Sequence, residues 1–95
     1  MMARIEIYTT RFCAYCQSAK ALLTRKGLTF SEIDVTGDHE GRNRMVRRTN
    51  GRMTVPQIFF GATHVGGFDE LYRLERAGKL DPLLATERSA EGPPA

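Results

Sequence analysis

The sequence predicts one α/β domain of three layers around a four-stranded mixed sheet, and three observations lead to this prediction. A strand-like segment, a helical segment and a second strand-like segment follow one another at the spacing of a right-handed parallel crossover. Two later strand-like segments are separated only by Gly61-Ala62, which indicates an antiparallel hairpin. The length of 95 residues fits a single domain. The predicted order is β-α-β-α-β-β-α.

The first half of the chain carries the crossover. Residues 4–9 (RIEIYT) are rich in β-branched and aromatic side chains, as in a strand. After the second cysteine, apolar residues at helical spacing predict a helix that Gly27 ends as a C-terminal cap. Residues 28–35 (LTFSEIDV) are predicted to form the second strand.

The second half begins with a predicted helix over 39–50, which Gly51 ends. Residues 57–60 and 63–65 form the predicted hairpin, and Gly66-Gly67 then breaks the strand. A third helix starts at Phe68 and places apolar side chains along one side.

The end of the chain is predicted to carry little structure. Residues 81–84 (DPLL) are predicted to form a short final turn, and residues 86–95 show no apolar periodicity. We therefore predict a folded domain over 1–85 and a disordered tail over 86–95.

The composition bounds the cellular setting. No stretch approaches the ~20 apolar residues of a membrane-spanning helix, and the first six residues (MMARIE) lack the apolar block of a secretory signal. We therefore expect a cytoplasmic protein that does not bind membranes. A secreted scaffold of this size would usually carry four or more cysteines, whereas this chain has 2. A disulfide that closes so short a loop contributes little to stability, so we do not expect a structural role for the pair.

The two cysteines, Cys13 and Cys16, stand at a predicted strand-to-helix junction. Free N–H groups and the dipole at a helix N-terminus favour an anion, here the Cys13 thiolate, and Arg11 adds positive charge nearby. Cys16 lies one helical turn further on the same face, within the roughly 4.4–6.8 Å that a disulfide requires between Cα atoms. The pattern predicts redox exchange, with Cys13 as attacking thiolate and Cys16 as its partner.

A zinc site is the competing interpretation of two cysteines at this spacing. Structural zinc takes four ligands, and the two histidines, His39 and His64, are far apart in different predicted elements. We expect them to be surface or rim residues, and we predict no metal ligands. Two other patterns have both a functional and a structural interpretation. Pro56 can simply open a strand, and the Gly66-Gly67 turn can either bind an anion or leave Asp69 as a helix cap.

Taken together, these motifs resemble the glutaredoxin family, and within it the small bacterial dithiol class. The resemblance covers residues 4–84. The matching stretches are Ile7-Tyr8-Thr9, Cys13-Ala14-Tyr15-Cys16, Ala19-Lys20-Ala21-Leu22-Leu23, Lys26-Gly27, Thr54-Val55-Pro56-Gln57-Ile58-Phe59, Gly66-Gly67-Phe68-Asp69-Glu70-Leu71 and Leu80-Asp81-Pro82-Leu83-Leu84.

The resemblance implies a thioredoxin-like fold in which the bond between Val55 and Pro56 is cis. It implies that backbone groups before this proline hold the cysteinyl part of glutathione and that the start of the third helix holds its γ-glutamyl end. The glycyl carboxylate would meet basic groups near Arg11 and the second helix. The glutathione-binding residues implied are Arg11, Tyr15, Thr54, Val55, Pro56, Gly67, Phe68 and Asp69.

Two positions depart from the family pattern. Ala14 replaces the proline of the commonest motif, Cys-Pro-Tyr-Cys, and this makes the helix start less preorganised. Family members without that proline can hold a glutathione-ligated [2Fe–2S] cluster between two subunits, which is the alternative function. Thr10 and Arg11 replace a lysine often found before the first cysteine, so the contact of the glycyl carboxylate stays open.

Five arginines gather around the second predicted helix. They suggest three interpretations: a solvated helix face, a surface that attracts anionic glutathione and acidic partners, or a nucleic-acid-binding module. The run contains no aromatic residue, which disfavours nucleic acid. The residues are Arg42, Arg44, Arg47, Arg48 and Arg52.

The predicted function is that of a glutathione-dependent thiol–disulfide oxidoreductase. Its expected partners are glutathione, as reducing co-substrate, and glutathionylated or disulfide-containing proteins; no permanently bound cofactor and no nucleic acid are expected. We expect a monomer. A thioredoxin-type reductase fed by a flavoprotein is disfavoured, because thioredoxins typically carry Trp and Gly-Pro in the cysteine motif.

Overall fold

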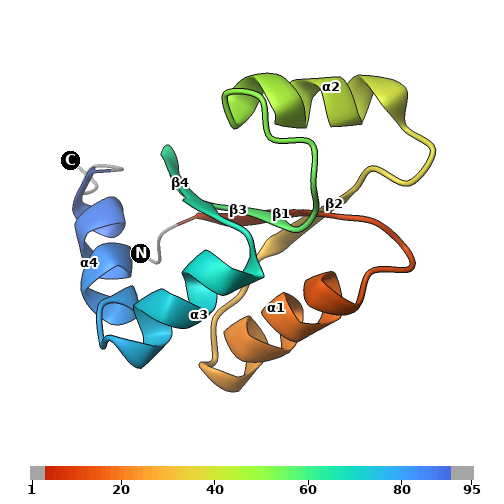
Figure 1. The fold of residues 1–95 in the computed structure, drawn as a ribbon. Coiled ribbons are helices and arrows are strands. Elements are labelled where there is room, and N and C mark those ends of the chain that lie inside the picture. Colours follow the sequence, from red (N-terminus) through yellow and green to blue (C-terminus); the bar gives the residue numbers. More distant parts are fainter. Residues whose placement is uncertain (1–3, 91–95) are drawn as a thin grey trace.

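The computed structural model describes residues 4–90, and a four-stranded sheet lies at its centre (Figure 1). The strands are β1 (Ile5–Thr9), β2 (Ser31–Asp34), β3 (Gln57–Phe60) and β4 (Thr63–Gly66), in the spatial order β2-β1-β3-β4. β1 pairs with β2 in parallel, whereas β3 is antiparallel to both β1 and β4. The predicted parallel crossover, hairpin and mixed sheet are confirmed.

Helices cover both faces of this sheet. They are α1 (Ala14–Arg25), α2 (His39–Arg48), α3 (Phe68–Arg76) and α4 (Leu80–Ala90). α2 lies alone on one face, α1 and α3 lie on the other, and α4 follows α3 on that side (Figure 1). These are the three predicted layers.

Alternation along the strands divides the apolar core between the two faces. In β1, Ile7 packs with α1 and α3, whereas its neighbour Tyr8 faces α2. In β3, Ile58 and Phe59 divide in the same way. β3 is therefore buried along its whole length, and this packing on both faces holds the residues that follow Pro56 in place.

The segment between α1 and β2 follows the prediction at its start. Gly27 adopts a φ of +73°, and the Leu28 amide donates to the Leu23 carbonyl oxygen at 3.0 Å, so this glycine ends the helix as predicted. The second strand begins at Ser31 rather than at residue 28, because Leu28 and Phe30 pack against the core from a loop.

The end of the chain differs from the prediction. Residues 81–84 belong to α4, which continues through residues 86–90, so the predicted turn and the start of the predicted tail are wrong. Leu80 and Leu84 are buried in the core, and one turn later Glu87 accepts a hydrogen bond from the Thr63 hydroxyl at 2.5 Å. This contact with β4 anchors a segment that has no apolar periodicity. The predicted tail over 91–95 lies outside the described residues. No helix within residues 4–90 has the length and apolar character to cross a membrane.

Candidate active site

Cys13 occupies the N-cap position of α1, directly after the loop that follows β1. Its backbone is extended (φ −136°, ψ 109°), and its Sγ accepts a hydrogen bond from the Cys16 amide at 3.1 Å. Amides at a helix N-terminus have no partner within the helix, so they stabilise negative charge on an atom placed there. Cys13 is also partly exposed. It is the accessible thiol of the pair, as predicted.

Cys16 is fully buried, with 0% of its surface exposed. Burial, and next the hydrogen bond with the Cys13 side chain, raise the pKa of the Cys16 thiol to about 12. Cys16 is therefore protonated at neutral pH. Since both cysteines are free thiols in this structure, the pair combines one accessible sulfur with one shielded, protonated sulfur.

The loop before β3 approaches the accessible sulfur. The Val55–Pro56 bond is cis, as the resemblance implied. The carbonyl oxygen of Val55 lies 3.8 Å from Cys13 Sγ, within reach of a thiol donor. The backbone of this loop therefore forms one wall beside the reactive atom.

A cleft of about 300 Å³ lies between this loop and the start of α3. Tyr15 and Phe68 both line it, and their rings pack against each other with centroids 6.2 Å apart and planes tilted by 30°. The cleft includes every predicted glutathione-binding residue except Arg11. Its lining consists of Tyr15, Arg52, Thr54, Val55, Pro56, Gly67, Phe68, Asp69 and Glu70.

Comparison with known proteins identifies the family. A family model described as Glutaredoxin matches residues 5–65. The chain belongs to the glutaredoxin family. It is similar to Glutaredoxin 3 of Escherichia coli strain K12, with 53% identity over 83 residues that cover 87% of this chain and 99% of the relative.

Solved structures agree with this assignment. The solution structure of a Brucella melitensis glutaredoxin is similar with a TM-score of 0.77 and 54% identity, over 87% of this chain and 89% of that one. The crystal structure of a buckwheat glutaredoxin–glutathione complex is similar with a TM-score of 0.78 and 28% identity, over 88% and 78%. The fold is thioredoxin-like, and this glutaredoxin is a thiol–disulfide oxidoreductase.

Arg11 stands apart from the cleft of this glutaredoxin. Its amide donates to the Thr36 hydroxyl at 2.7 Å, which ties the loop after β1 to the end of the neighbouring strand. The pKa of Asp34 is lowered mainly by hydrogen bonds from Thr36 and to a smaller extent by the charge of Arg11. Arg11 is not among the residues that line the cleft, and its predicted contact with glutathione stays a prediction.

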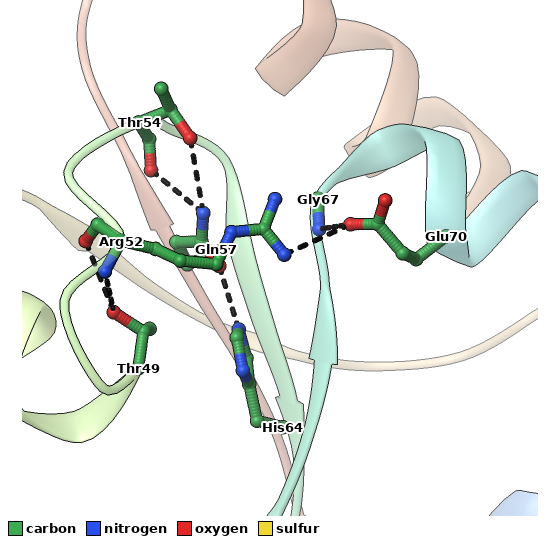
Figure 2. Close-up of polar contacts among 7 residues, drawn as sticks. All are labelled: Thr49, Arg52, Thr54, Gln57, His64, Gly67 and Glu70. Carbon is green, nitrogen blue, oxygen red and sulfur yellow. Dashed lines mark hydrogen bonds and ion pairs between the residues drawn. The ribbon is translucent and has the colours of Figure 1, made fainter.

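The cation that lines the cleft is Arg52, from the loop after α2. Figure 2 shows its guanidinium reaching toward Glu70, with Arg52 Nη1 and Glu70 Oε1 3.2 Å apart. The same carboxylate oxygen accepts from the Gly67 amide at 2.6 Å. This amide, and next Arg52, lower the pKa of Glu70. Glu70 is not among the residues predicted for the site, although a glutamate three residues after a helix N-cap is the signal for this contact. Arg52 was expected only as part of the arginine run.

Two of the remaining arginines of the run make specific contacts. The Arg48 guanidinium carbon lies 3.8 Å from the centre of the Phe59 ring, and its Nη2 pairs with Glu6 at 2.6 Å. Arg42 donates to the Met53 carbonyl oxygen at 3.2 Å and so supports the loop that carries Arg52. Arg48 is exposed, as the solvated-face interpretation expects, but its guanidinium also makes specific contacts with Phe59 and Glu6.

Among residues 4–90, no three His, Cys, Asp or Glu side chains are grouped as metal ligands would be. His64, considered as a zinc ligand from the sequence, contacts Gln57 and stacks on Phe59 instead.

Proposed function

We propose that this glutaredoxin uses glutathione to reduce protein–glutathione mixed disulfides and protein disulfides. The observation that carries the proposal is the cleft of about 300 Å³ beside Cys13, whose polar groups complement those of glutathione. Arg52 offers a cation to one carboxylate, the start of α3 offers amides to the other, and Asp69 offers a carboxylate to the ammonium group. The buckwheat relative of known structure is a complex with glutathione, which supports the same ligand here.

Reduction of a glutathionylated protein needs only Cys13. Its thiolate attacks the glutathione sulfur, so the bond between glutathione and the substrate breaks and the substrate leaves as a thiolate that takes up a proton. Cys13 is then joined to glutathione. A second glutathione thiolate attacks the bound glutathione sulfur, which forms glutathione disulfide and returns the Cys13 thiolate. The Cys16 amide, which donates to the sulfur at the start of α1, stabilises its negative charge at both ends of this cycle.

Reduction of a protein disulfide also needs Cys16. After Cys13 attacks, the enzyme and substrate are joined by a mixed disulfide. Cys16 gives its proton to the departing substrate sulfur and attacks Cys13, so an internal disulfide closes. Part of the rise in the pKa of Cys16 comes from the Cys13 side chain, so it is relieved once Cys13 is in a disulfide, although burial remains. Two glutathione molecules then reopen the pair.

A protein substrate would approach over exposed apolar surface. Phe12, next to the reactive Cys13, is 92% exposed, and Met53 beside the cleft loop is exposed as well. We further propose that the protein acts as a monomer in the cytoplasm, where a reducing glutathione pool drives the cycle.

The test is glutathione-dependent reduction of a glutathionylated peptide by the wild type, Cys13→Ser and Cys16→Ser. We expect Cys13→Ser to be inactive and Cys16→Ser to keep its activity on the peptide while losing activity on a protein disulfide. An inactive wild type would contradict the proposal. Purification without oxygen and in the presence of glutathione would then test the cluster-carrier alternative by its visible absorbance.

A further inference from the structure

A buried amide links the cleft loop to the edge strand β4. Gln57 follows Pro56 at the start of β3 and has 0% of its surface exposed. Its Nε2 donates to the Thr54 carbonyl oxygen at 3.0 Å and to the Thr54 hydroxyl at 3.3 Å. Its Oε1 lies 2.7 Å from His64 Nε2, and Figure 2 shows the three residues in a row. Both the nitrogen and the oxygen of this amide are therefore engaged.

The partners determine the direction of each hydrogen bond. A carbonyl oxygen only accepts, so the NH₂ end of the Gln57 amide must face Thr54. Gln57 Oε1 must then face His64, and it also only accepts. His64 is consequently the donor, which assigns the ring proton to Nε2. The Thr54 carbonyl oxygen sets the orientation of the amide, and the His64 Nε2–H holds the opposite end of the amide in that orientation.

The imidazole itself is held firmly. It stacks on Phe59 with ring centroids 4.9 Å apart and planes at 28°. Arg48 covers the same Phe59 ring at 3.8 Å. Burial, followed by the charges of Arg52 and Arg48, lowers the pKa of His64, whereas Glu70 acts in the opposite direction. His64 is therefore neutral at physiological pH, and its single N–H is directed at Gln57.

We propose that His64 is a positioning residue for glutathione, which acts through Gln57 to hold Thr54 in place as a wall of the cleft. This inference rests on the proposed function, because glutathione is the ligand that the wall would hold. Thr54 and Val55 line the cleft, and the Val55 carbonyl oxygen lies 3.8 Å from Cys13 Sγ. Because Gln57 already holds Thr54 in place, this part of the cleft loses no conformational entropy when the ligand binds, whereas a mobile Thr54 would make binding weaker.

The discriminating variant is His64→Phe. Phenylalanine keeps a ring to stack on Phe59 but has no N–H, so the buried Gln57 Oε1 loses its partner and only the bonds to Thr54 still hold the amide. We expect the KM for a glutathionylated peptide to rise about tenfold with kcat unchanged. Calorimetry should show an equal loss of affinity for S-methylglutathione, an unreactive thioether. His64→Gln, whose amide supplies an N–H at a similar reach, should restore most of the affinity.

Two controls separate positioning from a general effect on folding. His39→Phe makes the same change at the other histidine, which is exposed at the start of α2, and should leave KM and affinity unchanged. In a Gln57→Met background the link is already cut, so adding His64→Phe should produce no further loss.

The outcomes distinguish this inference from the proposed function. The positioning role would be overturned if His64→Phe bound S-methylglutathione as tightly as the wild type. It would also be overturned if His64→Phe lowered this affinity by the same factor in the Gln57→Met background as in the wild type. A fall in kcat and melting temperature with KM unchanged would overturn it too, because it would show only a loss of folded protein. A wild type without turnover would contradict the proposed function, and the calorimetric comparison of variants would still test His64.

Discussion

Gly66→Ala is a sharp test of how the cleft is held together. Gly66 ends β4 with a φ of +119°, which residues with a side chain rarely adopt. A Cβ at this position would also collide with the Glu70 side chain, whose Cδ would lie 3.0 Å away. The carboxylate of Glu70 would have to leave the Gly67 amide and Arg52, the contacts that join the start of α3 to the loop after α2.

The expected cost has two parts. The backbone conformation costs an alanine about 1–2 kcal/mol. The hydrogen bond between Glu70 and Gly67 at 2.6 Å is charge-assisted, which suggests about 1.5–3 kcal/mol. We take about 1.5 kcal/mol because the Glu70 side chain is 38% exposed and water replaces part of the contact; the exposed pair with Arg52 adds little. The sum is about 3 kcal/mol, or a fall of about 15 °C in Tm for a domain of this size.

Urea unfolding followed by circular dichroism measures this loss, since the chain has no Trp to report by fluorescence. Gly78→Ala is the matched control. Gly78 also has a positive φ, +70°, but a Cβ there would meet nothing within 4 Å, so only a backbone cost of about 1 kcal/mol is expected. If Gly66→Ala costs no more than Gly78→Ala, the contacts of Glu70 do not stabilise the cleft.

Buried and partly buried groups lead to three further predictions. Iodoacetamide at pH 7 should label Cys13 alone in the native protein, because Cys16 is buried with a pKa of about 12; native protein labelled twice would contradict this, and urea should expose the second site. The free energy of unfolding should fall as the pH drops below about 6.5, because the folded state lowers the pKa of His64 and the unfolded chain binds the proton more readily. His64→Phe should remove this fall. A wild-type pH profile that matches the profile of the variant would disprove the prediction. Glu87→Ala should lower the free energy of unfolding by about 1 kcal/mol, because it removes the hydrogen bond from the Thr63 hydroxyl. In a double-mutant cycle, adding Thr63→Val should lower it almost no further, and additive losses would argue against the contact.

The sequence alone was sufficient for features that depend on local pattern. Segments rich in β-branched and aromatic residues, helical apolar spacing and the glycines between them predicted the order of elements from β1 to α3, since these signals are local. The spacing of Cys13 and Cys16 at a strand-to-helix junction predicted which sulfur is accessible. The other cleft residues came from the family resemblance, because Pro56 and the Gly66-Gly67 turn are each ambiguous when taken alone.

Tertiary structure decided whatever depends on contacts between distant segments. α4 extends beyond residue 85 because Glu87 meets β4, which no periodicity within the segment reveals. Arg52 rather than Arg11 lines the cleft because the course of two loops, and not the count of charges, determines where a long side chain ends. Gln57 and His64 lie on paired strands, and only the register of β3 against β4 brings the imidazole to the buried amide. Local sequence sets which face a residue occupies, whereas packing sets which neighbour it meets there.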